Sequence, residues 1–575
     1  MSPPPTLCMP CAPLTQRMKH ACFACACIEQ SPFVAKARAT GFTQLFLSVI
    51  ALSLVTLASA AKPTVTEASP YNLDTFYLVL DGIWYISFYS TVILVPILLI
   101  NTHSIFIGPA EIDQSAPRPK FPEHDKYSKV LAKALQIPTI SEGPTSDTKT
   151  DTTQLLKLHA LLKDSFPLAH EQLSVTVVNS FSLVFKWVGS EPNRGPIMLC
   201  AHLDVVPAPG EWQQPPFSGK IVDDVIWGRG AIDNKHNLIG ELAAVEELLK
   251  KGFKPERTVY LAFGHDEEIG GNEGAKKIAE YLTNVEKIPK HGIVAIFDEG
   301  PMMVEGALPG IKGPVALVAN SEKGAITVEL SIDAPGGHSS MPPIKEQGSI
   351  SIIADAVLKL ERNQFPAHFS ASKAGVYQQL RLMRPYFSFP MKIIACNLWL
   401  FSPLMKKLLL GASNAAAAML RTTTATTVIK GGTKTNVLPY SVKAYVNHRI
   451  HPEETIESVI QRDKDLINDE RVKVIGYDMA IPPSPVSNIE SEQFTWVVKS
   501  VGKVFNNPTT CSIMIGNTDT RWYWDLSSHI FRFSPVELNI KELGMFHGLD
   551  ERISVAGMSK VVEYYMELIK VAQPE

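Results

Sequence analysis

From Phe121 onward, apolar residues follow two spacings, one typical of strands and one typical of helices. Residues 175–189 (VTVVNSFSLVFKWVG) predict a β-hairpin, and the short apolar runs at 196–200 and 258–264 predict buried strands. Residues 235–252 (KHNLIGELAAVEELLKKG) place apolar side chains three and four positions apart, which predicts an amphipathic helix. We therefore expect an α/β sheet with helices on both faces.

Two uncharged stretches precede this region, residues 39–61 and 82–101. Both are long enough, or nearly so, to cross a bilayer. The first follows Lys36 and Arg38 and ends in small residues that also suit signal cleavage. The second begins with aromatic residues and contains a proline. A buried core helix is the alternative for each stretch, but both lie outside the α/β region, so we expect membrane helices.

Composition excludes some partners. The net charge is −3 and no basic stripe occurs, so a nucleic-acid partner is not expected. Cysteines crowd near the N-terminus, where a zinc knuckle is a weaker interpretation than acylated or idle thiols: Cys8, Cys11, Cys22, Cys25 and Cys27. No N-x-S/T sequon with x other than proline occurs, which weakens, without excluding, a glycosylated lumenal location.

Acidic residues and histidines stand at the ends of apolar runs, within glycine-rich or polar turns. The strings are MLCAHLDVVP, WGRGAIDNK, LAFGHDEEIGG, IFDEG and FHGLDERIS, and the residues are His202, Asp204, Asp233, Glu267, Glu268, Asp298 and His547. Any one of them alone is more simply a solvated surface residue. Open α/β sheets place their sites at strand ends, so the combination instead predicts a hydrolase site for two metal ions.

The residue types suggest which side chains would bind each of the two metal ions. Two dications about 4 Å apart need one carboxylate between them, and Asp233 is the natural bridge. The remaining ligands would be two imidazoles and two carboxylates, from His202, His547, Glu268 and Asp298.

Two acidic residues remain beside these ligands. Glu267 adjoins a ligand without being one, which is where a general base belongs. Asp204 lies two residues after His202, on the same face of an extended segment, where it would orient the imidazole.

The strings HLDVVP, WGRGAIDNK and DEEIGG resemble those of the co-catalytic zinc metallopeptidases. That family includes aminoacylase, carboxypeptidase S, succinyl-diaminopimelate desuccinylase and glutamate carboxypeptidases, and this chain is most similar to the carboxypeptidase S and N-fatty-acyl-amino acid synthase/hydrolase branch. The resemblance covers about Phe121 to Val571. It implies an α/β zinc-hydrolase domain with a central mixed sheet flanked by helices, an inserted smaller α+β lid domain, and two Zn²⁺ ions per chain.

The resemblance also implies a role for each site residue. Glu267 would be the catalytic base and Asp204 the partner of the first histidine. One zinc would be held by His202 and Asp298, the other by Glu268 and His547, with Asp233 as the bridge.

The family's lid domain implies further residues. His338, in APGGHSSMPP, matches a histidine that stabilises the oxyanion, often in the site of a neighbouring subunit, although a turn histidine bonded locally is the alternative. Asn436 and Arg449 match substrate-binding positions, and Arg449 would hold a free carboxylate. Arg521 is a weaker candidate for that task. Asn517 stands where a second glycine is expected.

We expect an N-terminal region over 1–110, a hydrolase domain from 121–324 and 479–575, and a lid or dimerisation domain over 325–478. Within the lid, residues 365–419 form an unusually apolar insert. We interpret it first as ordinary lid or dimer core. The alternative is a groove for an acyl chain, or a helix pair that touches a membrane.

The sequence thus indicates a membrane-associated, zinc-dependent enzyme that hydrolyses the amide bond of N-acyl amino acids, with long-chain fatty acyl groups as one alternative, or forms it in reverse. The catalytic domain is expected in the secretory pathway, as a possible homodimer through the lid. A carboxypeptidase acting on short peptides would share the same catalytic residues. The alternative of another class is a catalytically inactive membrane receptor or scaffold, which the complete residue set disfavours.

Overall fold

The computed structural model describes residues 91–103, 121, 124–142, 151–344, 348–370, 374–477 and 480–574. The chain divides into two units, Met1–Ile100 and Asn101–Glu575. Residues 91–103 are helical. Among the described residues, no helix is both long and apolar enough to cross a membrane. The expected membrane segment at 39–61 and the first residues of the one at 82–101 lie outside the described residues.

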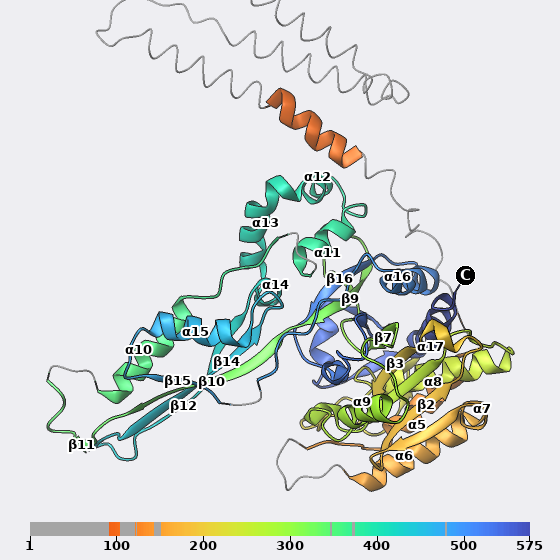
Figure 1. Cartoon of the computed structure of the whole chain (residues 1–575), viewed down its shortest axis with the longest axis horizontal. Coiled ribbons are helices and arrows are strands. Elements are labelled where there is room, and N and C mark those ends of the chain that lie inside the picture. Colours follow the sequence, from red (N-terminus) through yellow and green to blue (C-terminus); the bar gives the residue numbers. More distant parts are fainter. Residues whose placement is uncertain are drawn as a thin grey trace, which may run out of the picture. The chain divides into compact units, whose positions relative to one another are not determined.

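A ten-stranded mixed sheet forms the centre of the second unit (Figure 1). Nine strands follow the order β1-β2-β6-β3-β7-β17-β9-β8-β18, and β16 pairs with β9. Parallel pairs such as β3–β6 and β3–β7 stand beside antiparallel pairs such as β1–β2 and β2–β6. The strands are β1 (Ser174–Val178), β2 (Ser182–Trp187), β3 (Ile197–His202), β6 (Val259–Gly264), β7 (Ala295–Asp298), β8 (Met303–Glu305), β9 (Pro314–Glu322), β16 (Thr509–Met514), β17 (Ile530–Arg532) and β18 (Glu537–Asn539).

Helices cover both faces of this sheet, as the alternation of side chains along β3 shows. Leu199 belongs to one hydrophobic cluster with residues of α8 and α17, while Met198 and Cys200 belong to another with residues of α9. The helices around the sheet are α5 (Lys126–Leu135), α6 (Thr152–Ser165), α7 (Pro167–Gln172), α8 (Lys235–Lys250), α9 (Ala275–Asn284), α16 (Glu492–Phe505) and α17 (Val555–Val571). The expected fold class, a mixed sheet flanked by helices, is confirmed.

Shorter elements complete this part of the chain. A three-stranded sheet has the order β19-β5-β4. Its strands are β4 (Ile221–Val222), β5 (Val225–Trp227) and β19 (Arg552–Ser554), and the 3₁₀ turns are η3 (Pro192–Arg194), η4 (Glu267–Ile269), η5 (Asp519–Trp522) and η6 (Ile540–Met545).

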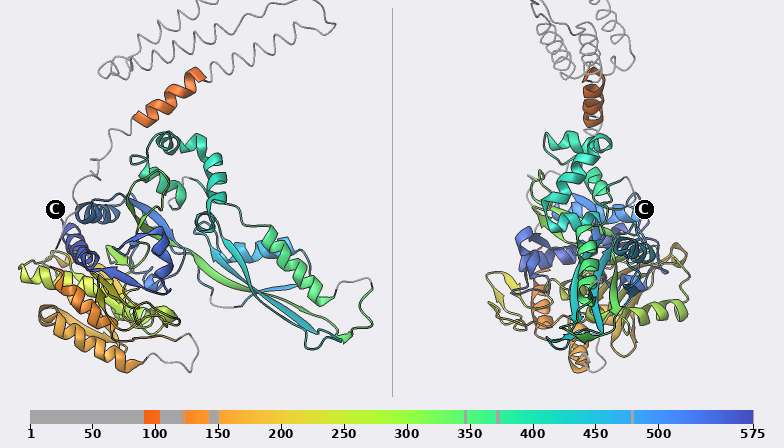
Figure 2. Two further views of the ribbon diagram at one scale, coloured as in Figure 1. Left: turned by 180° about the vertical axis from the view of Figure 1, so that it is seen from behind. Right: turned by 90° about the vertical axis from the view of Figure 1, so that its left-hand side faces the viewer.

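A smaller α+β part, which we call the inserted part, is built around a four-stranded sheet of order β12-β14-β10-β15. Only Lys323 separates β9 from β10. Helices α10 and α15 pack on one face of this sheet (Figure 2). The elements are β10 (Gly324–Asp333), β11 (Gly337–His338), α10 (Ser349–Arg362), β12 (Thr423–Gly431), β13 (Val437–Leu438), β14 (Ser441–Ile450), α15 (Ile456–Ile467) and β15 (Lys473–Gly476).

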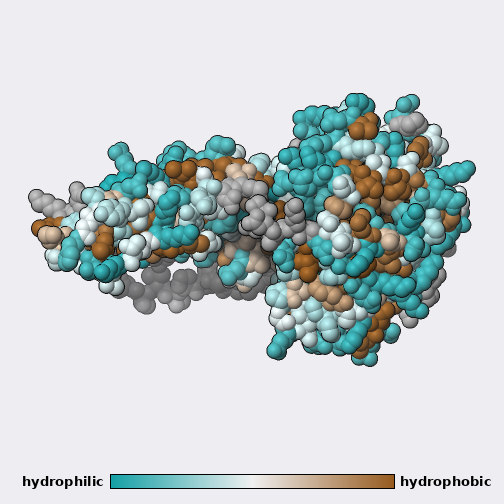
Figure 3. All heavy atoms as spheres, turned by 90° about the horizontal axis from the view of Figure 1, so that it is seen from below, coloured by the Kyte–Doolittle hydropathy of each residue, from teal (hydrophilic) through white to brown (hydrophobic). Residues whose placement is uncertain are grey.

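The apolar insert at 365–419 forms helices α11 (Val376–Met383), α12 (Met391–Cys396), α13 (Leu398–Ala412) and α14 (Asn414–Leu420). Its buried side chains, among them Leu398 and Met405, form a cluster that also includes Val315 of β9. Other apolar side chains of α13 are exposed, including Trp399, Leu404 and Leu408. By contrast, the face of the molecule seen from below carries apolar residues in small groups among hydrophilic ones (Figure 3).

Candidate active site

The candidate residues meet where parallel strands of the large sheet end. His202 is the last residue of β3, and Glu267 and Glu268 form η4 just after the neighbouring β6. Asp233 lies in the turn before α8, and His547 lies between η6 and β19. The carboxyl ends of parallel strands share one edge, so residues far apart in the sequence reach one place.

Asp233 stands between two imidazoles. Its Oδ1 lies 3.1 Å from Nε2 of His202, and its Oδ2 lies 2.7 Å from Nε2 of His547. Each carboxylate oxygen thus faces a different histidine, which is the arrangement required of a carboxylate that bridges two metal ions.

The turn that carries Asp233 is held by Glu551, a fully buried residue. Oε1 of Glu551 accepts hydrogen bonds from the backbone N–H groups of Ile232 and Asp233, at 2.7 and 3.0 Å. Oε2 accepts from the N–H of Gly230 and from Nη1 of Arg229. This carboxylate therefore fixes the backbone of Asp233.

Glu299, rather than Asp298, joins His202 and Asp233. Oε2 of Glu299 lies 3.4 Å from Nε2 of His202, and these three residues form one group that could hold a metal ion. Asp298 is not part of any such group in the described residues, and its Oδ1 accepts from the backbone N–H of Glu299 at 2.8 Å. The role of Asp298 as a ligand stays a prediction, and its Oδ2 is buried without a hydrogen-bond partner in the described part of the chain. Asp298 is the last residue of β7, and Glu299 follows it with an oxygen beside His202.

A second group that could hold a metal ion consists of Asp233, Glu268 and His547. Nε2 of His547 lies 3.4 Å from Oε2 of Glu268, whose Oε1 is buried without a hydrogen-bond partner in the described part of the chain. The two groups share Asp233. Imidazole nitrogens, carboxylate oxygens and an unpaired buried oxygen form a donor set that fits two borderline-soft dications.

Glu267 lies within this cluster, in a third group with His202 and Glu268, and Asp204 supports its backbone. Oδ1 and Oδ2 of the buried Asp204 accept from the N–H groups of Glu267 and Glu268, at 3.1 and 3.2 Å. Oδ1 of Asp204 also lies 3.3 Å from Nδ1 of His202. One carboxylate thus fixes the turn η4 and the first imidazole together.

Charge crowding shifts the pKa values of the cluster. Burial and the nearby Glu299 raise the pKa of Glu267 well above its usual range, and burial together with Asp233 does the same to Glu268. Burial would raise the pKa of Asp233, but hydrogen bonds from His202 and His547 lower it. The carboxylates outnumber the histidines here, and bound dications would relieve their repulsion.

The three residues expected from the lid fall at two places in the inserted part. His338 and Asn436 lie together, where Ser339 N–H donates to the carbonyl of Asn436, beyond the far end of β10. A strand of ten residues spans about 33 Å, so neither residue reaches the metal cluster of its own chain. Arg449 pairs with Ala325 at the near end of β10, and its Nη1 donates to Oδ1 of Asn517 at 3.3 Å.

The motif GNTDTR contributes residues whose position the sequence did not reveal. Arg521 donates a hydrogen bond to the carbonyl of Gly270, next to η4. Arg449 instead contacts Asn517. Asp519 is buried against Gly264 and Gly271, where an added Cβ would lie 2.6 and 2.0 Å from its carboxylate oxygens. Gly264 and Gly271 are therefore required by close packing against Asp519. The sequence alone does not show this requirement, because Asp519 lies far from them along the chain.

Comparison with known proteins agrees with this geometry. Residues 198–571 match the model of Peptidase family M20/M25/M40. The chain belongs to this family. It is a hydrolase of a metal-dependent family, and the alternative of an inactive receptor or scaffold is set aside.

Individual relatives match most of the chain. It is 39% identical over 448 residues to a probable carboxypeptidase S-like 2 of Dictyostelium discoideum, covering 76% of this chain and 84% of that protein. It is 38% identical over 494 residues to N-fatty-acyl-amino acid synthase/hydrolase PM20D1 of Xenopus tropicalis, covering 83% and 93%. The crystal structure of the M20 family metallo-carboxypeptidase Sso-CP2 from Sulfolobus solfataricus matches with a TM-score of 0.56 at 17% identity, covering 78% and 99%, which supports the fold.

Proposed function

We propose that the protein uses two Zn²⁺ ions to hydrolyse the amide bond of N-acyl amino acids. The observation that carries the proposal is the position of Asp233, whose two oxygens each face a different histidine. The similarity to an N-fatty-acyl-amino acid synthase/hydrolase favours acyl amino acids as the substrate class. Amide formation is the microscopic reverse, so the same site would serve synthesis when amine and fatty acid are abundant.

The zinc ligands would be divided between the two groups of the cluster. His202 and Glu299 would hold one ion, Glu268 and His547 the other, and Asp233 both. When bound, such ions lower the pKa of water and polarise the amide carbonyl.

Glu267 would move the proton. Its carboxylate lies beside His202 and Glu268, where a group that takes a proton from water and returns it to the leaving amine is required. Asp204 would hold the base in place through the backbone of η4.

Arg449 would bind the free carboxylate of the substrate. Its side chain is exposed and its guanidinium contacts Asn517, whose Nδ2 donates to the carbonyl of Lys323 at 2.8 Å. This arrangement places a cation where β9 passes into β10, with donors left over for a carboxylate. Asn436 would act on the substrate from the far end of the inserted part, together with His338.

His338 would stabilise the oxyanion in the site of a second copy, because β10 carries it away from its own cluster. This requires a homodimer, and a complementation experiment tests it. His338→Ala and Glu267→Gln proteins are each expected to be inactive. After mixing and subunit exchange, about a quarter of wild-type activity should return, because half of the dimers are mixed and each has one intact site. Absence of recovery in verified mixed dimers would contradict the shared site.

A substrate panel tests the reaction itself. Purified protein should cleave acetyl and long-chain acyl amino acids, and Glu267→Gln should not. Carboxypeptidase activity on short peptides is the second candidate, favoured by the similarity to a carboxypeptidase S-like protein. Preference for short peptides with a free C-terminal carboxylate over every acyl amino acid would select that candidate, and no turnover of either class would reject the proposal.

We also propose that the N-terminal region anchors the enzyme to a membrane of the secretory pathway. The support is the absence of charged residues at 39–61 and 82–101. Fractionation of cells expressing the full chain and a version beginning at Phe121 would test this.

A further inference from the structure

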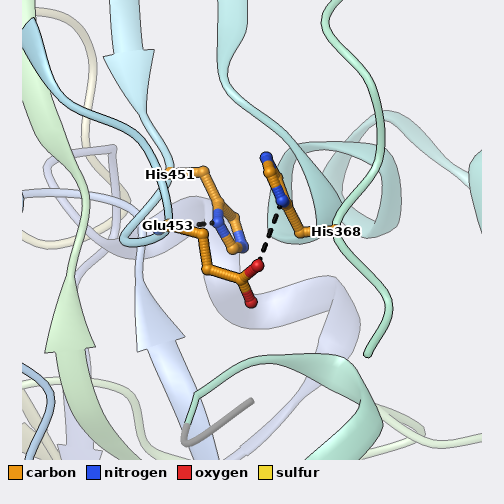
Figure 4. A group of neighbouring side chains, drawn as sticks. All are labelled: His368, His451 and Glu453. Carbon is orange, nitrogen blue, oxygen red and sulfur yellow. Dashed lines mark hydrogen bonds and ion pairs between the residues drawn. The ribbon is translucent and has the colours of Figure 1, made fainter. Parts of the chain in front are cut away.

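Another group of side chains with metal-binding chemistry lies in the inserted part, apart from the active site (Figure 4). His368 follows α10, and His451 and Glu453 lie in the turn between β14 and α15. One ligand atom from each of the three lies within 4.8 Å of the others. Neither Asp233 nor the other residues of the active-site cluster take part.

The surroundings of His368 are those of a metal-binding histidine. Its Nε2 donates to Oε1 of Glu454 at 2.6 Å, and the other oxygen of Glu454 accepts from Oγ1 of Thr422 at 2.5 Å. Its Nδ1 lies 3.2 Å from Oε2 of Glu453. A histidine that donates one N–H to an anchored carboxylate presents the other nitrogen as an oriented ligand.

His451 provides an independent observation. It is only 1% exposed, and its Nε2 has no hydrogen-bond partner in the described part of the chain. Leaving a polar nitrogen buried and unpaired is unfavourable. In Figure 4 the rings of His451 and His368 lie side by side, with the carboxylate of Glu453 directed toward them.

We propose that His368, His451 and Glu453 bind a third divalent cation of the zinc class, with Glu454 orienting His368. Two imidazoles and a carboxylate suit Zn²⁺, whereas Mg²⁺ and Ca²⁺ prefer oxygen ligands alone. The carboxylates of Glu453 and Glu454 supply the negative charge that a dication requires.

Binding requires two small adjustments. The rings are stacked, with centroids 4.5 Å apart and planes 14° apart, and an ion lies in the plane of each imidazole that binds it. His368 is the ring that would tilt about its hydrogen bond to Glu454, since it is partly exposed on a loop while His451 is buried. Binding through Nε2 of His451 also places its proton on Nδ1, so the 3.2 Å contact with the N–H of Glu453 must open.

The ion would fasten the apolar insert to the inserted sheet. His368 stands near the start of the insert, and its N–H donates to the carbonyl of Leu420 at the end of α14. Thr422 precedes β12, and its Oγ1 also accepts from the N–H of His451. One ion would therefore join both ends of the insert to the turn after β14.

Zinc binding to a full-length variant with a disabled active site tests the proposal. The variant His202→Ala/Asp233→Asn, which breaks every active-site group and is freed of metal with a chelator, should still bind about one Zn²⁺ per chain in calorimetry, with a rise in melting temperature. Adding His368→Ala should weaken that binding at least about 100-fold and abolish the rise. His170→Gln, at a partly exposed histidine outside both clusters, is the matched control and should change neither.

Glu453→Gln keeps the shape of the side chain, so it replaces His368→Ala in the test if that variant fails to fold. It should also weaken zinc binding. The proposal is overturned if the folded active-site variant binds no zinc, or if Glu453→Gln leaves its binding unchanged. It is also overturned if both substitutions lower the melting temperature equally with and without zinc, because the cluster would then be a clasp of hydrogen bonds and ion pairs alone.

Discussion

The N–H of Glu267 donates a 3.1 Å hydrogen bond to Oδ1 of Asp204, so Asp204 holds the backbone of the proposed base in place. In Asp204→Asn, one side-chain oxygen becomes an NH₂ group that cannot accept from the N–H of Glu267 or Glu268. We expect kcat to fall about 10- to 100-fold, with little change in KM. Steady-state kinetics with matched metal content measures this, and a change confined to KM would argue against the positioning role.

Neighbouring acidic residues allow a matched test of the metal ligands. Glu299→Gln should lose one metal ion per chain and most of the activity, because Oε2 of Glu299 faces His202. Asp298→Asn should retain both ions, since Asp298 instead accepts from the backbone. Elemental analysis of the two proteins decides between them. Metal loss in Asp298→Asn alone would instead identify Asp298 as the ligand, as the sequence predicts.

Glu267→Gln should keep its metal content while hydrolysis falls at least about 100-fold, which is the usual size of a general-base contribution. Its side chain lies within the cluster, but Asp233, Glu299 and Glu268 already supply the carboxylates of the two groups. Kinetics on the metal-replete variant tests this. Wild-type turnover in that protein would remove Glu267 from the mechanism.

The large sheet and most residues of the active-site cluster could be predicted because short stretches of the sequence indicate both. Buried strands are continuous apolar runs, and His202, Asp233 and Glu268 follow such runs directly. The choice between Asp298 and Glu299 depends on which side of the chain faces the cluster, and a pair of adjacent carboxylates does not show this. Glu551 and the pairing of His368 with His451 depend on contacts between distant segments, which no local pattern records.

Stability should depend on pH through Glu247, which joins α8 to α5. Burial would raise the pKa of Glu247, but hydrogen bonds from Lys126 and Tyr127, at 2.7 and 2.6 Å, outweigh it and lower the pKa to about 2 from 4.5. A lowered pKa in the folded state stabilises the protein above the unfolded value near 4.5, and this contribution is lost as the pH falls toward 2.

We therefore expect Glu247→Gln to lower the free energy of unfolding at pH 7 by about 1–3 kcal/mol. Near pH 3 the difference from wild type should shrink to about half. Urea unfolding at both pH values measures it, with Glu280→Gln, an exposed partner of Lys277, as the control. A difference that stays constant with pH would mean that the Glu247 carboxylate keeps its ordinary pKa.

The exposed apolar side chains of α13 provide the test for acyl-chain binding. Leu404 and Leu408 are 47% and 56% exposed, whereas Leu398 is 3% exposed and belongs to the packed core of the insert. If the insert receives the acyl chain, Leu404→Gln or Leu408→Gln should lower kcat/KM for long-chain acyl amino acids, because each lost apolar contact is worth roughly 1 kcal/mol. Acetylated substrates should be unaffected. Leu398→Gln should instead reduce stability and lower the activity on both substrates together, since it places an amide in the core. Parallel losses for both substrate lengths in the Leu404 and Leu408 variants would assign the insert a folding or dimer role.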